Sequence, residues 1–125
     1  MMNKQVYVQQ VADWARIRGY TDILANVDGY AKPKAYGRQQ DGESFVPDVT
    51  GKQFDQKSYF EVVLKTNDTD YLIAKLKLLY QLATRNGGQL FLMVPKGHSL
   101  FAKAIASNSR VPAEIIVLPE RKKIS

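Results

Sequence analysis

The sequence predicts an α/β fold in which a mixed central sheet is sandwiched by helices, in the order α-β-β-β-α-β-α-β. Three β-type segments follow the first helix with no helix between them, which favours antiparallel pairing. Two later strands are each preceded by a helix, which is typical of crossover connections. A chain of 125 residues with 45% hydrophobic content fits a single domain over residues 1–125, ending in a basic tail at 119–125.

The N-terminal part predicts a helix, a strand and a polar arm. Apolar residues recur at helical spacing over residues 4–18, and residues 21–27 form a strand pattern. The polar span 30–44 is expected to continue as a hairpin arm that turns near Asp41 and Gly42. Residues 45–49 then predict a short strand, 51–58 a link, and 59–65 a stronger strand.

The C-terminal part has the clearest periodicity. A helical apolar stripe over residues 72–83 is preceded by several N-cap candidates and ended by Gly87 and Gly88. The continuous apolar run at 89–94 is typical of a strand that is covered on both faces and lies in the sheet centre. A short helix from Ser99 to about residue 106 and a last strand at 114–118 complete the order.

The candidate site residues lie around two of these strands. Asp48 follows a proline at a turn, and the strand after it is expected to end in Lys65. Glu61 lies within an apolar strand, where a charge must face solvent, meet a partner or change its protonation state. Lys57 or Lys65 can be that partner, because alternate residues of a strand share one face.

These residues resemble the PD-(D/E)xK nuclease superfamily, which includes restriction endonucleases and archaeal Holliday-junction resolvases. Pro47 and Asp48 match the first half of the motif, and Lys65 matches its final lysine. The resemblance implies a restriction endonuclease-like three-layer α-β-α sandwich. It also implies that Asp48 and a second acid hold Mg²⁺, and that Lys65 orients or activates the attacking water.

The motif position for the second acid, two residues before the lysine, is Val63. Glu61 is the nearest acid on the same strand face, and it begins about 6.6–6.8 Å further along the strand. Glu61 can serve as the second metal ligand if the ion sits deeper in the sheet, if a bulge re-aims the strand, or if water bridges the gap. The expected catalytic residues are therefore Asp48, Glu61 and Lys65, with Gln10 or Asp13 of the first helix at the rim.

The sequence leaves three interpretations of function, which come from different classes. The leading expectation is a metal-dependent endonuclease that hydrolyses DNA phosphodiester bonds. The alternative, supported by Val63, is a catalytically degenerate nuclease-fold module that binds nucleic acid or a protein partner without cleavage. A third interpretation is a protein-interaction subunit, such as a homodimer, whose basic charge serves solubility alone.

The charge of the chain favours a polyanionic partner. The formal net charge is +6, and most of the excess lies in residues 46–125. In the polar arm, Lys32, Lys34 and Arg38 stand among tyrosines and are candidates for nucleic-acid binding. An ordinary hairpin edge blunted by lysine explains the same pattern.

Composition argues against several other chemistries. The chain has no cysteine and one histidine, His98, which is expected to be a loop or capping residue. Zinc sites, cysteine nucleophiles and a serine–histidine triad therefore have little support. No apolar run approaches the ~20 residues of a membrane span, and the N-terminus lacks a secretion signal, so a cytoplasmic protein is expected.

Overall fold

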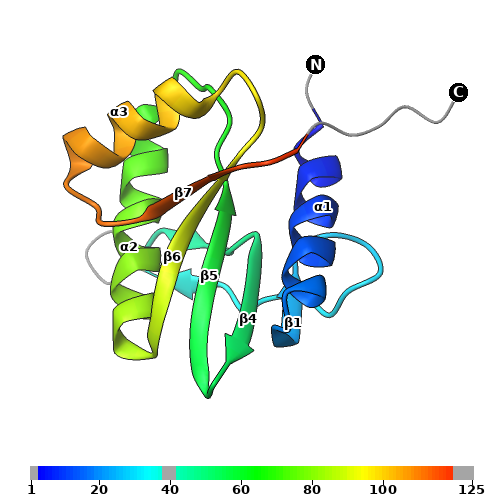
Figure 1. The fold of residues 1–125 in the computed structure, drawn as a ribbon. Helices are drawn as coiled ribbons and strands as arrows, with labels where there is room; N and C mark the ends of the chain where they lie inside the picture. Colours follow the sequence, from blue (N-terminus) through cyan, green and yellow to red (C-terminus); the bar gives the residue numbers. More distant parts are fainter. Residues whose placement is uncertain (1–2, 38–41, 120–125) are drawn as a thin grey trace, which may run out of the picture.

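The computed structural model describes residues 3–37 and 42–119, which form a mixed five-stranded sheet with helices on both faces (Figure 1). Helix α1 covers one face, and helices α2 and α3 cover the other. This arrangement confirms the expected α/β class and mixed sheet. The elements are α1 Lys4–Ile17, β1 Thr21–Ala25, β2 Tyr36–Gly37, β3 Ser44–Phe45, β4 Val49–Gln53, β5 Gln56–Val62, α2 Thr69–Arg85, β6 Gly87–Val94, α3 Ser99–Ser109 and β7 Glu114–Val117.

The sheet changes from antiparallel to parallel at β5. Its strand order is β1-β4-β5-β6-β7, with antiparallel pairing up to β5 and parallel pairing from β5 to β7. Helices α2 and α3 supply the crossovers between the parallel strands, as such connections require. Strand β6 is covered on both faces, as its apolar run predicts, but the centre of the sheet is occupied by β5 and not by β6.

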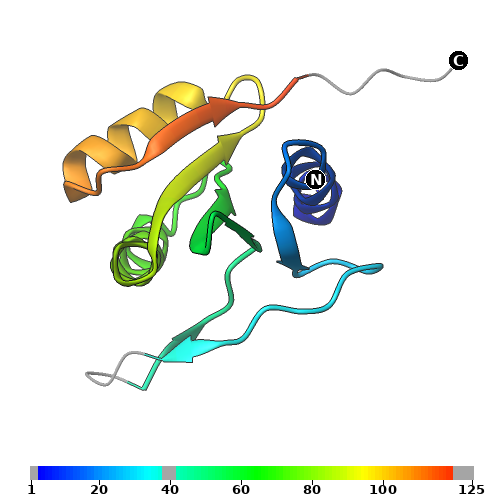
Figure 2. The same ribbon diagram turned by 60° about the horizontal axis from the view of Figure 1, so that its bottom comes forward.

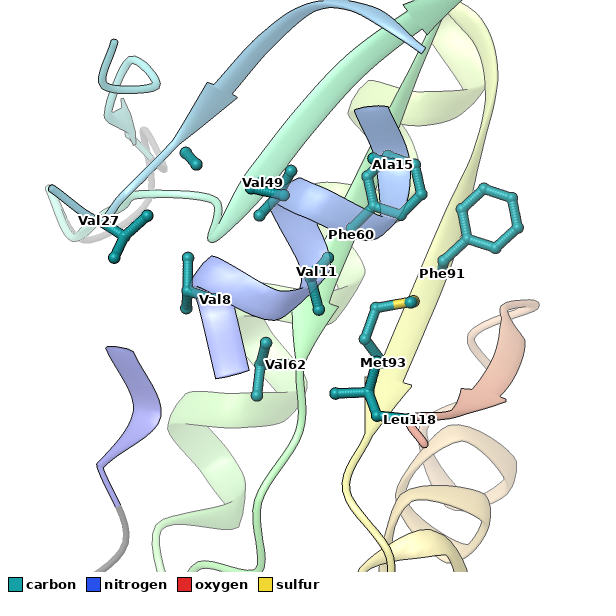
Figure 3. Packing of buried hydrophobic residues seen from close by; sticks show 12 residues of the cluster. Val8, Val11, Ala15, Val27, Val49, Phe60, Val62, Phe91, Met93 and Leu118 are labelled. Atoms are coloured by element: carbon teal, nitrogen blue, oxygen red, sulfur yellow. The ribbon is translucent and has the colours of Figure 1, made fainter. Parts of the chain in front are cut away.

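Alternation along β5 divides the core into two layers. Phe60 and Val62 pack with Val8 and Val11 of α1, as Figure 3 shows. The alternate residues face α2 and α3, where Tyr59 of β5 and Val63, which directly follows β5, join the second apolar cluster. Glu61 therefore lies on the α2 side of the sheet.

The segment expected to be a link, residues 51–58, is mostly strand. Strands β4 and β5 form a hairpin, in which Gln53 pairs with Gln56 across a two-residue turn at Phe54 and Asp55. Both turn residues have positive φ, 56° and 61°, as a type I′ hairpin turn requires. The expected strand at 45–49 is also divided, since Phe45 ends β3 and Val49 begins β4.

A second, shorter hairpin extends beside the sheet (Figure 2). Strands β2 and β3 pair Tyr36 with Phe45, which confirms a hairpin arm over part of the polar span. Phe45 is buried and packs against Tyr71 of α2, with ring centroids 5.2 Å apart. Residues 38–41, which include the expected turn at Asp41, lie outside the described residues, as does the basic tail beyond Pro119.

Two helix starts have side-chain caps. Asn3 Oδ1 accepts a hydrogen bond from Gln5 N at α1, and Asp68 Oδ1 accepts one from Tyr71 N at α2. His98, which is expected to be a loop or capping residue, is the N-cap of α3, but it makes no side-chain capping hydrogen bond. Within residues 3–37 and 42–119, no helix has the length and apolar content that crossing a membrane needs.

Candidate functional site

The site is built on a pair of carboxylates, Asp48 and Glu61, from adjacent segments of the β4–β5 hairpin. Asp48 directly precedes β4, and Glu61 lies near the end of β5. Asp48 N donates to Glu61 Oε1 at 3.1 Å, and Val62 N donates to Asp48 Oδ2 at 2.9 Å. Both side chains are buried, so these two backbone bonds hold the carboxyl groups together in a place that excludes most water.

Two lysines from different helices neutralise this pair. Lys4 Nζ of α1 lies 3.0 Å from Asp48 Oδ2 and 3.6 Å from Glu61 Oε2. Lys75 Nζ of α2 lies 2.5 Å from Glu61 Oε2 and 3.9 Å from Asp48 Oδ1. The Lys4 side chain is 42% exposed and that of Lys75 only 8%, so Lys4 stands at the outer side of the pair and Lys75 at the inner side.

The buried acids and their lysines shift the pKa values of Glu61 and Lys4. Burial, followed by the charge of Asp48, raises the pKa of Glu61 to about 7, although Lys75 and Lys4 oppose the rise. Burial by itself would lower the pKa of Lys4, but the negative charges of Glu61 and Asp48 outweigh it and raise that pKa above its usual value. Lys4 is therefore charged at neutral pH, whereas Glu61 is poised between its two protonation states.

Lys65 does not join the ion pairs that the described residues form at this site. Strand β5 ends at Val62, three residues earlier than expected, so strand alternation no longer directs Lys65. Its backbone N donates to His98 Nδ1 at 2.8 Å, which anchors this segment to the start of α3. The Lys65 side chain is exposed and lines the same cavity as Glu61.

Lys75 was not among the residues predicted for the site. It lies on the buried stripe of α2, between Leu72 and Leu79 at helical spacing. A lysine on an apolar stripe needs a buried partner, so the position of Lys75 on this stripe was the sequence signal for a buried ion pair. Val63, at the motif position, is buried in the apolar cluster under α2 and α3.

An open cavity of about 350 Å³ lies next to the carboxylates. Glu61 and Lys75 form part of its wall, together with Lys4 and Lys65. Three ammonium groups thus line the cavity, in which Glu61 is already paired and Asp68 is the other acidic residue. Such a cavity suits an anionic ligand that approaches the carboxylates from solvent.

The other predicted residues lie in different surroundings. Lys32 Nζ donates to Val27 O at 2.5 Å and is 4.0 Å from Asp28, whereas Lys34 is exposed. Arg38 lies outside the described residues. At the rim positions, Asp13 accepts hydrogen bonds from Gln9 and Tyr30, and Gln10 Nε2 donates to Pro119 O.

The donor set of Asp48 and Glu61 fits a hard divalent cation. Carboxylate oxygens are the ligands that Mg²⁺ prefers, and one or two of them with water and substrate phosphate complete such sites. Within the described residues, no group of three or more acidic, histidine or cysteine side chains gathers. A cation at this pair would take the place of the Lys4 ammonium, because Lys4 is the partner with access to solvent.

In comparisons with known proteins, no family model, curated protein or solved structure matches this chain.

Proposed function

We propose that this chain is a magnesium-dependent endonuclease of PD-(D/E)xK type that hydrolyses phosphodiester bonds in DNA. The observation that carries the proposal is the convergence of Asp48, which directly precedes β4, and Glu61 of β5, which are held together in a buried site. Buried acids that repel one another are costly to the fold, and such arrangements cluster at functional sites. The sandwich of α1, sheet and α2 with α3 agrees with the three-layer architecture of this superfamily.

Counted from Glu61, the acid-x-lysine motif lacks its lysine. In an acid-x-lysine motif, the lysine stands two residues after the acid, and that position here is Val63. Lys75 brings an ammonium group to Glu61 from α2 instead. We therefore assign the water-orienting role to Lys75, and leave Lys65 for contact with the substrate.

The chain's own residues have separable roles in this reaction. Asp48 and Glu61 would hold the ion, and Mg²⁺ when bound lowers the pKa of a water ligand and offsets charge on the phosphate. Lys75 orients the water and stabilises the negative charge that grows on the phosphoryl oxygens. The water oxygen forms a bond to phosphorus, the bond from phosphorus to the leaving oxygen breaks, the water's proton passes to solvent, and the leaving oxygen takes one up.

A second candidate function has an observation of its own. Lys4 and Lys75 already compensate the two carboxylates, so the site is close to electroneutral without an ion. A module that keeps these charges for stability, and binds DNA through its surface lysines without cleavage, has the same arrangement. The two candidates differ in one measurable property, which is metal-dependent cleavage.

The test is DNA cleavage by the purified protein with Mg²⁺ or Mn²⁺, on branched, duplex and single-stranded DNA. Asp48→Asn, Glu61→Gln and Lys75→Gln are each expected to lower the cleavage rate by about 100-fold or more, as loss of one charge-stabilising group does. Lys77→Gln is the matched control, because Lys77 is on the same helix and exposed. It should cleave as the wild type does.

Cleavage that survives in Asp48→Asn would remove the metal site from the proposal. Salt-sensitive DNA binding without cleavage, by a folded wild type and at every metal tested, would favour the non-catalytic module instead. A larger loss in Lys65→Gln than in Lys75→Gln would return the water-orienting role to Lys65.

A further inference from the structure

We propose that the cavity beside Asp48 and Glu61 binds one unpaired nucleotide of single-stranded DNA, whose base stacks on Tyr71. This inference rests on the proposed function, namely that the chain acts on DNA, and it adds the class of substrate. The preferred DNA is then a single strand or a single-stranded segment next to the bond that is cut.

The size and position of the cavity suit one nucleotide. Its volume of about 350 Å³ lies at the lower end of the range for small-ligand pockets. One wall contains Glu61 and Lys75, where the phosphate would be cut. A nucleotide bound in the cavity would therefore be an immediate neighbour of the reacting group.

Tyr71 provides an aromatic surface at this cavity. It is 42% exposed, although its ring packs against the buried Phe45 ring at 5.2 Å with an interplanar angle of 52°. Its backbone is fixed as well, because Tyr71 N donates to Asp68 Oδ1 at 3.3 Å. A large ring that is supported from the protein side and remains open to solvent is the kind of surface on which nucleic-acid bases stack.

The charges of the cavity suit the backbone of the same nucleotide. Lys4, Lys65 and Lys75 line it, and the exposed Thr66 adds a hydroxyl donor beside Lys65. The one further carboxylate in the wall, Asp68, is occupied as the N-cap of α2. Cationic groups next to an exposed aromatic ring are typical of single-strand binding sites. In such sites the cations bind the phosphate backbone, and the base stacks on the aromatic ring.

Duplex DNA does not fit this arrangement, because its bases are stacked inside the helix. A base reaches a pocket of this kind only when it is unpaired or flipped out, and flipping costs a few kcal/mol of unstacking. A single strand avoids that cost. The expected preference is therefore for single-stranded over duplex DNA of the same length.

The experiment measures binding of fluorescently labelled single-stranded and duplex oligonucleotides by anisotropy, in EDTA and at fixed salt. Wild type should bind the single strand more tightly. Tyr71→Ala should weaken single-strand binding by about tenfold or more, whereas Tyr71→Phe should retain it, because the stacking face remains. Phe54→Ala is the matched control, since Phe54 is an aromatic residue that is 89% exposed at the β4–β5 turn.

A Tyr71→Trp variant gives a direct spectroscopic signal. Stacking of a base should quench its added fluorescence, measured against the wild type, whose one tryptophan is Trp14. Equal affinity for duplex and single strand, no effect of Tyr71→Ala, or no quenching would each overturn the subsite, even in a chain that cleaves DNA. Tyr71-dependent binding by a chain that cleaves nothing would support the subsite and remove the nuclease proposal.

Discussion

At the scale of single residues, the acid pair is the unusual feature of this chain, because four charged side chains share one partly buried place. Asp48 and Glu61 were predicted from the sequence, since a turn aspartate and a glutamate in an apolar strand stand out. Lys75 was missed, because it is a charged residue on a helical stripe that is otherwise apolar. The residue that pairs with Glu61 depends on how α2 packs across β5, and the local sequence does not determine that packing.

The raised pKa of Glu61 makes stability depend on pH. Its pKa is about 7 in the folded chain against an ordinary value of 4.5, so its contribution to stability is complete below about pH 4.5 and is lost as the pH rises through 7. Relative to Glu61→Gln, the wild type should lose on the order of 3 kcal/mol of unfolding free energy across this window. Urea unfolding of both proteins from pH 4 to pH 8 measures the difference.

That comparison isolates Glu61, because Lys4, Asp48 and Lys75 are present in both proteins. A constant difference between the two curves over the whole range would mean that Glu61 does not titrate there.

Removal of Lys75 should destabilise the fold most at high pH. Lys75→Met leaves two buried carboxylates with Lys4 alone, and loss of one partner of a buried ion pair costs about 3–5 kcal/mol. At pH 5 the loss should be smaller, because Glu61 can then take up a proton. Lys77→Met, on the exposed side of α2, should change stability by less than about 0.5 kcal/mol.

At the scale of elements, prediction from sequence succeeded where periodicity was strong and failed at turns. The stripes of α1 and α2 and the apolar run of β6 gave their positions to within a few residues. The β4–β5 hairpin was not recognised, because Phe54 and Asp55 are not a usual turn pair and a glycine at 51 favours a link over a strand. Gly51 is instead a strand residue over which Tyr20 lies, and an added Cβ would be 3.2 Å from Tyr20 Cβ.

The β4–β5 turn should accept better turn residues. Phe54 and Asp55 both have positive φ, which costs about 1–2 kcal/mol for a residue other than glycine. The double substitution Phe54→Asn with Asp55→Gly should therefore raise stability by about 1 kcal/mol or more, seen as a higher Tm. Phe54→Ala keeps the strained φ and should give no such gain, and an unchanged Tm in the double variant would argue against the type I′ turn.

At the scale of the whole molecule, the positive charge is expected to act through the cavity rather than evenly over the surface. Binding of a single strand should weaken with salt, with a slope of about −0.7 for each phosphate contact. Lys65→Gln should reduce the magnitude of that slope by about 0.7, because Lys65 is exposed at the cavity. Lys103→Gln, an exposed position on α3, is the control and should leave the slope unchanged.

Lys4 lies in the first turn of α1, so access of a cation to the two carboxylates depends on the motion of that one turn. Fraying of that turn, which is fastened by Asn3, would withdraw one ammonium and leave the sheet and α2 undisturbed. Lys75 would remain in place, since it lies in the middle of a long helix. The acids could thus exchange one counter-charge for another without any rearrangement of the domain.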